Sequence, residues 1–189
     1  ALLAANPDAQ EGLGDPAELA AGLAVAPPPQ LFSVAPELVC TDQFATEVEL
    51  TGEGFLTVEG ALPTVHFGTT DLVADLAEDC FDLGGPTEAR SCNTLVVTIP
   101  AGTLVPGVYD VSVTNPSPAD CVSTESVQIE AIAPPTLTGI VEDLVCDDQY
   151  TNDFTLTGTG FLMIGTDVPT VTIGTWSSLA TVNTDTCTP

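Results

Sequence analysis

The sequence predicts an all-β protein made of tandem antiparallel β-sandwiches, and three observations carry this prediction. Apolar and polar side chains alternate over short segments such as Glu47–Leu50 and Tyr109–Thr114, which is the period of a strand with one buried face. Proline and glycine, 16 of each among 189 residues, interrupt these segments at short intervals, as expected for a sandwich of short strands. The third observation is that long stretches of the chain recur.

The repeat has a period of 106 residues. The heptapeptide Leu-Thr-Gly-Glu-Gly-Phe-Leu at 50–56 returns as Leu-Thr-Gly-Thr-Gly-Phe-Leu at 156–162, and Cys40 returns as Cys146, so both pairs lie 106 positions apart. A period of this length corresponds to a whole domain. Residues 27–133 are therefore predicted to form a complete sandwich, and residues 134–189 an incomplete one.

Residues 1–26 have two interpretations. The pairs Asn6-Pro7 and Ala26-Pro27 resemble Asn115-Pro116 and Ala133-Pro134, so this segment could be the last hairpin of a preceding copy. The alternative is an alanine-rich flexible leader, as is common at chain ends.

The strands of the complete repeat are predicted from the turn residues that bound them. The first lies between Pro29 and Pro36, the second ends at the glycines of 52–54, and the third lies between Pro63 and Gly68. The sixth begins after Pro106 and ends before Pro116. In order, we expect strands near residues 31–35, 46–52, 63–67, 72–77, 94–99, 107–114 and 122–131.

A set of motifs in the repeat resembles a known domain family. The motifs are Pro-x-Leu-x-x-Val-x-Pro at 29–36, Thr-Gly-Glu-Gly-Phe at 51–55, Pro-Thr-Val-x-Phe-Gly at 63–68, Leu-Val-Val-Thr-Ile-Pro-Ala-Gly-Thr at 95–103 and Pro-Gly-Val-Tyr-Asp-Val-Ser-Val-Thr-Asn-Pro at 106–116. In this order they resemble the IPT/TIG (immunoglobulin-like, plexin, transcription factor) domain. The resemblance implies tandem immunoglobulin-like antiparallel β-sandwiches, in which the glycines at 52 and 54 turn the backbone as the second strand ends.

Two segments depart from the family pattern. Glu37–Gln43 stands where many such domains have a glycine-rich loop, and Asp79–Ser91 is an insert that carries a cysteine. The family occurs in bacterial surface and secreted proteins, in receptor ectodomains and in some transcription factors, so the resemblance implies a fold and leaves the function open.

The charge of the chain excludes several classes of partner. Arg90 is the only cation among Lys and Arg, against 27 acidic residues, and the net charge is −26. Nucleic-acid binding needs many Lys and Arg contacts to phosphate, and adsorption to an anionic membrane needs them too. We therefore expect no nucleic-acid partner and no direct membrane insertion, and the composition, 44% hydrophobic, argues against a disordered acidic chain.

The six cysteines predict disulfides and an oxidising, extracellular or cell-surface location. Zinc is disfavoured, because the chain has no Cys-x-x-Cys pair and a single histidine. The favoured pairing joins Cys80 to Cys92 and, by elimination, Cys40 to Cys121. The alternative joins Cys40 to Cys80 and Cys92 to Cys121, with Cys146 bonded to Cys187; under the favoured pairing, Cys146 and Cys187 are unpaired or bonded outside this chain.

No catalytic residue and no cofactor are predicted. His66 is matched in the repeat by Thr172, so we interpret it as a strand residue on the wet face. Trp176 and Tyr150 are expected to pack, with ligand stacking as the alternative. We interpret two acidic groups as solvated surface, with a Ca²⁺ site as the alternative. The groups are Asp147, Asp148 and Asp153, and Glu78, Asp79 and Asp82.

These observations favour a structural protein over an enzyme. We expect a module of an extracellular stalk, adhesin or fibre of a bacterial or archaeal surface protein, with proline-rich joints between its domains. Its partners would be continuation of the same polypeptide in an array or self-association, in which a neighbouring subunit completes residues 134–189. The alternative is a carbohydrate- or protein-binding module of a larger secreted protein.

Overall fold

The computed structural model describes residues 26–40, 42, 44–84, 88–141 and 153–183. All regular secondary structure in these residues is β-strand, so the prediction of an all-β chain is confirmed for this part of the chain. The chain divides into two compact units after Ile132, and each unit is described by itself.

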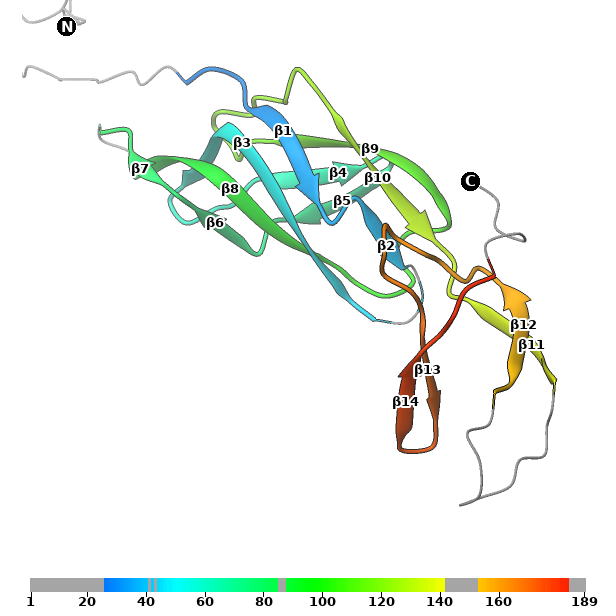
Figure 1. Ribbon diagram of the computed structural model, residues 1–189. Helices are drawn as coiled ribbons and strands as arrows, with labels where there is room; N and C mark the ends of the chain where they lie inside the picture. Colours follow the sequence, from blue (N-terminus) through cyan, green and yellow to red (C-terminus); the bar gives the residue numbers. More distant parts are fainter. Residues whose placement is uncertain (1–25, 41, 43, 85–87, 142–152, 184–189) are drawn as a thin grey trace, which may run out of the picture. The chain divides into compact units, whose positions relative to one another are not determined.

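The first unit is a sandwich of two five-stranded sheets (Figure 1). One sheet has the order β1–β3–β8–β6, with β7 also paired to β8, and the other has the order β2–β10–β9–β4–β5. The strands are β1 (Gln30–Ala35), β2 (Leu38–Cys40), β3 (Thr46–Val58), β4 (Thr64–Phe67), β5 (Thr70–Val73), β6 (Leu76–Glu78), β7 (Phe81–Asp82), β8 (Ala89–Ile99), β9 (Gly107–Thr114) and β10 (Val127–Ile132).

One hydrophobic core lies between the two sheets. It is made by alternate residues of the central strands, which are fully or almost fully buried while their neighbours face outward. The core residues from the first sheet include Leu31, Val48, Leu50, Phe55, Leu95 and Val97, and those from the second include Val65, Phe67, Val111, Val113 and Ile129.

The predicted strands are present with different bounds, and one difference lies where the chain changes sheets. The segment predicted as one strand at 72–77 is divided, because β5 pairs with β4 in one sheet and β6 pairs with β8 in the other. Ala74 and Asp75 make the crossing, donating their N–H groups to Pro63 and Val96. Local alternation continues through a crossing of this kind, so the sequence pattern does not reveal it.

A second difference is β2, which lies inside the segment Glu37–Gln43 that was expected to be a loop. Its three residues pair in parallel with the end of β10, Cys40 opposite Ile132. A strand of three residues is too short for a periodic signal, and its partner lies about 90 residues further along the chain. At the other end of the repeat, β10 begins at Val127, where residue 122 was expected.

The glycines at 52 and 54 make a bulge within a strand. β3 was expected to end there, but it shifts register between Thr51 and Phe55 and continues to Val58. A Cβ on Gly52 would collide with the carbonyl oxygen of Gln30 and the ring of Phe55, and Gly54 has a φ of 73°, a conformation that favours glycine. The bulge therefore needs both glycines, and it lets the Phe55 ring fill the core against Gly52.

The described residues of the second unit contain two antiparallel strand pairs that reproduce two strand pairs of the first. Its strands are β11 (Thr136–Val141), β12 (Thr155–Thr159), β13 (Thr170–Ile173) and β14 (Trp176–Leu179). β11 pairs with β12 as β1 pairs with β3, including the same register shift, and β13 pairs with β14 as β4 pairs with β5. The equivalence extends to single hydrogen bonds: Ala180 donates to Pro169 at 2.9 Å, as Ala74 donates to Pro63 at 2.9 Å.

Candidate functional site

One disulfide is present in the described residues, between Cys80 and Cys92. Cys92 lies in β8 opposite Phe55 and is fully buried. The bond therefore fastens the cysteine-bearing insert, residues 79–91, to the core strand that follows it. The sequence separation of the two cysteines is 12 residues.

The second disulfide expected by elimination, Cys40–Cys121, is not formed. Both cysteines are free and partly buried, and they lie at opposite ends of the same sheet. Cys40 is level with Ile132 at one end of β9, and the Cys121 carbonyl accepts from Asn115 N–H just beyond the other end. The 8 residues of β9 span roughly 26 Å at ~3.3 Å per residue, whereas a disulfide needs Cα atoms within about 7 Å.

The remaining cysteine assignments follow from these positions. The alternative pairing, Cys40 with Cys80 and Cys92 with Cys121, is not the one that the structure has. Cys146 and Cys187 lie outside the described residues.

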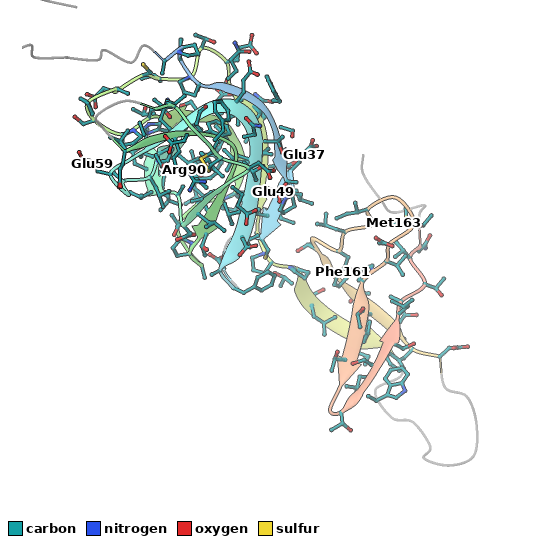
Figure 2. All side chains as sticks on the ribbon, turned by 90° about the vertical axis from the view of Figure 1, so that its left-hand side faces the viewer. Glu37, Glu49, Glu59, Arg90, Phe161 and Met163 are labelled. Carbon is teal, nitrogen blue, oxygen red and sulfur yellow. A yellow bond between two sulfur atoms is a disulfide. The ribbon has the colours of Figure 1, made fainter. Side chains whose placement is uncertain are left out.

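The cation Arg90 lies beside this disulfide on β8 (Figure 2). Its guanidinium Nη2 donates to the carbonyl oxygen of Cys80 at 3.5 Å. An open hollow here is also lined by Asp82 and Glu88. Because the carboxylates outnumber the single cation, this hollow is not suited to binding an anion.

The most organised polar group in the first unit is formed by His66, Asp71 and Thr114. The Asp71 carboxylate accepts from His66 Nδ1 at 2.7 Å, and His66 Nε2 lies 2.7 Å from the Thr114 hydroxyl. With Nδ1 as the donor, a neutral ring accepts the Thr114 proton at Nε2. This order of hydroxyl, imidazole and carboxylate is that of an activated nucleophile.

The surroundings of these three side chains argue for a structural role. His66 alternates with the buried Val65 and Phe67, so it stands on the outer face of the β5–β4–β9 sheet. The open hollow lined by Glu37, Val108 and Glu130 and the one beside Arg90 do not include any of the three. Hydrolysis would need a substrate cavity with donors for an oxyanion. We therefore interpret the trio as a polar cross-strand cluster.

The equivalent positions of the repeat also indicate a structural role for His66 and Asp71. His66 and Asp71 are direct cross-strand partners, and their counterparts 106 residues later, Thr172 and Ser177, are also cross-strand partners with hydroxyl oxygens 2.9 Å apart. The exchange of His66 for Thr172 is thus matched by an exchange of Asp71 for Ser177, which the interpretation from sequence did not include. Paired changes at two repeat positions indicate contact, so this signal could have identified the partner.

The structure describes some, but not all, of the other candidate metal-binding and aromatic residues. Within the described residues, no group of three or more His, Cys, Asp or Glu side chains is arranged to hold a metal ion, and this includes Glu78, Asp79 and Asp82. Asp147, Asp148 and Tyr150 lie outside those residues. Trp176 begins β14 opposite Ile173 and is exposed.

The second unit exposes large apolar side chains whose counterparts in the first unit are buried. We call residues 133–141 and 153–183 the open segment. Phe161 is 41% exposed and Ile173 is 49% exposed, whereas their counterparts Phe55 and Phe67 are 0% exposed; Phe161 is labelled in Figure 2. The same contrast holds for Leu137, Ile140, Leu162 and Ile164, whose counterparts Leu31, Val34, Leu56 and Val58 are buried.

The chain matches no protein-family model and no curated protein. Within the described residues, no helix is long and apolar enough to cross a membrane.

Proposed function

We propose that the chain is a structural module of an extracellular stalk, adhesin or fibre, built from tandem immunoglobulin-like sandwiches of the IPT/TIG type. The observation that carries this proposal is the repeated strand pairing. The orders β1–β3–β8–β6 and β10–β9–β4–β5 correspond to the A–B–E–D and G–F–C–C′ sheets of immunoglobulin-like domains. The second unit repeats the A–B and C–C′ pairs in the same register.

The joints between modules support an array rather than a set of loosely tethered domains. In each unit, the second glycine of the Thr-Gly-x-Gly-Phe motif lies against the proline-rich entry to that unit. A Cβ on Gly54 would lie 3.4 Å from Pro29 Cα, and one on Gly160 would lie 3.4 Å from Pro135 Cα. Each module therefore packs on its own entering linker, and proline limits the rotation that remains.

The composition and the disulfide support an extracellular setting. Cys80–Cys92 is a kind of bond that persists in oxidising compartments. A net charge of −26 keeps such a surface hydrated, and high salt would screen its self-repulsion.

Immunolabelling of the source cells tests this function. Antibodies raised against the full chain should label intact, unpermeabilised cells or a secreted fibre, and external protease should remove the label. Label that appears only after permeabilisation would refute the extracellular assignment. Specific, saturable binding of a glycan or protein by the first unit, with no label in any extended structure, would favour the ligand-binding alternative.

A further inference from the structure

Only one peptide bond of this chain follows a lysine or an arginine. Arg90 is the single residue of either type among the 189 residues. Trypsin-like serine proteases cleave after these residues, because their specificity pocket holds a carboxylate. The Arg90–Ser91 bond lies between Cys80 and Cys92, which form a disulfide. The one site in this chain for such a protease is therefore enclosed by a disulfide ring.

The strand that contains this bond is covered on both edges. Arg90 and Ser91 pair with β3 on one side and with β7 on the other. The Arg90 side chain is exposed, but Ser91 is buried. An extended peptide is recognised by adding its backbone to another strand along an open edge. In the folded unit, the Arg90–Ser91 bond presents no such edge to a protease.

The disulfide is the main attachment of β7 to the sheet. Both residues of β7 have exposed side chains, that of Phe81 at 56%, so burial of apolar surface contributes little to holding this strand. Just beyond it, Leu83 N–H donates to the Ala89 carbonyl at 3.0 Å. Cys80, directly before β7, packs against the core and is bonded to the fully buried Cys92. The bond therefore anchors a strand that its own pairing would hold weakly.

The bond also lies where β8 begins. Arg90 is the second residue of this strand, and of the residues before Cys92 only Ser91 is buried. Opening of a strand end that buries few side chains costs little free energy. Without the tie at Cys92, β7 and the first residues of β8 could therefore open together, while Leu95 and Val97 stay packed in the core.

We propose that Arg90–Ser91 is a cleavage site for trypsin-like serine proteases, protected while Cys80–Cys92 is oxidised and exposed when this disulfide is reduced. A dithiol reduces the bond to two thiols and itself becomes a disulfide. Hydrolysis then adds water across the peptide bond, leaving a carboxylate on Arg90 and an amine on Ser91. A cut made while the disulfide is intact leaves the two fragments joined. This inference goes beyond the proposed function, because it does not depend on how modules assemble.

Limited proteolysis of the full chain with trypsin tests the protected state. The oxidised chain should be cut at least about a hundredfold more slowly than a synthetic peptide of residues 88–95, because cleavage requires local opening. The cut product should stay one molecule until a dithiol is added, when residues 1–90 and 91–189 separate. Mass spectrometry with and without the dithiol measures both. Equal rates for chain and peptide, or separation without the dithiol, would overturn the proposal.

Removal of the disulfide tests the exposed state. The double variant Cys80→Ala and Cys92→Ala should be cut after Arg90 at least about tenfold faster than the oxidised chain, because cleavage follows the population of the open form and no disulfide restricts that form. A smaller increase in the folded variant would overturn the proposal.

A second arginine on β3 distinguishes local opening from unfolding of the whole unit. Glu49, labelled in Figure 2, is exposed, lies opposite Ala35 and Val96, and precedes Leu50, which is fully buried. Glu49→Arg therefore adds a trypsin site that is covered on both edges and lies outside the disulfide ring. In this variant, removing the two cysteines should speed cleavage after Arg90 and leave cleavage after position 49 within ~threefold. An equal increase at the two sites would overturn local opening.

A second form of the chain covers the case in which the double alanine variant does not fold. The wild-type chain, reduced with a dithiol and alkylated, then takes its place in the same comparison. Loss of the fold in both forms, measured by circular dichroism, would overturn the proposal, because the disulfide would then hold the whole unit rather than β7 alone. Labelling of intact cells does not involve Arg90, so this inference and the proposed function can fail separately.

Discussion

Phe55 and Phe161 occupy the same position of the repeat, and both rings pack against the glycine three residues earlier, Gly52 and Gly158. Phe55 is 0% exposed and Phe161 is 41% exposed. The local structure is therefore set by the motif itself, while burial is set by strands that come from elsewhere in the sequence. This difference between local pairing and burial explains why Phe55 is buried in the first unit while the equivalent Phe161 is exposed in the second.

Asn115 should be the most important polar residue of the first unit. Asn115→Ala removes two hydrogen bonds and leaves the buried groups of Gly54 and Leu56 without partners, which should lower the free energy of unfolding by about 2–4 kcal/mol. Urea denaturation of the full chain measures this. Asn93→Ala, an exposed position in β8, should stay within ~0.5 kcal/mol; a similar loss for both would show that Asn115 does not hold the bulge.

Alanine should be tolerated less well at Gly52, in the bulge of β3, than at Gly60, in the turn that follows β3. Gly52→Ala places a Cβ against the Gln30 carbonyl and the Phe55 ring, so it should cost about 3 kcal/mol or more. Gly60→Ala meets nothing within 4 Å, and only its φ of 81° opposes alanine, at a cost of about 1–2 kcal/mol. Thermal unfolding of the two variants checks the order, and a reversed order would refute the packing described for Phe55.

Thiol alkylation should distinguish the two free cysteines of the first unit from the two that form the disulfide. Alkylation without reductant, followed by peptide mass mapping, should modify Cys40 and Cys121 and leave Cys80 and Cys92 unmodified. Because Cys40 and Cys121 lie at opposite ends of β9, oxidation should join them only between two chains. A Cys40–Cys121 bond found in the monomer would contradict the topology of the second sheet.

The cross-strand pair at His66 and Asp71 should be exchangeable for its repeat counterpart. His66→Thr or Asp71→Ser alone should cost about 0.2–1 kcal/mol, as is usual for a cross-strand pair, and the double variant should recover part of the loss. Chemical denaturation of the two single variants and the double variant measures this coupling. Additive losses would show that Thr and Ser do not form the bond seen between Thr172 and Ser177.

Much of the first unit could be predicted from the sequence, because alternating segments bounded by Pro and Gly define strands locally. The three-residue β2 and the division of the 72–77 segment could not be predicted, since both depend on partners far along the chain. The Cys40–Cys121 pairing was wrong for the same reason. Elimination among cysteines takes no account of strand order, and the order β2–β10–β9 places these two at opposite ends.

The exposed residues of the open segment were foreseen only in outline. The period of 106 residues aligns residues 134–189 with residues 28–83, which precede β8, β9 and β10 in the first unit. The hydrogen bonds between Asn115 and the bulge of β3 could not be read from the sequence, because the residues that they join are about 60 positions apart.

Native-state hydrogen exchange of the monomeric full chain tests the central claim most directly, by comparing equivalent amides in the two units. The amides of β4 lie between two paired strands, whereas those of β13 lie beside one. We predict that the amides of Val171 and Ile173 exchange at least about a hundredfold faster than those of Val65 and Phe67, because local opening of an uncovered hairpin costs little free energy. Equal protection at the two sets of positions would contradict the account, since it would mean that the open segment is already complete.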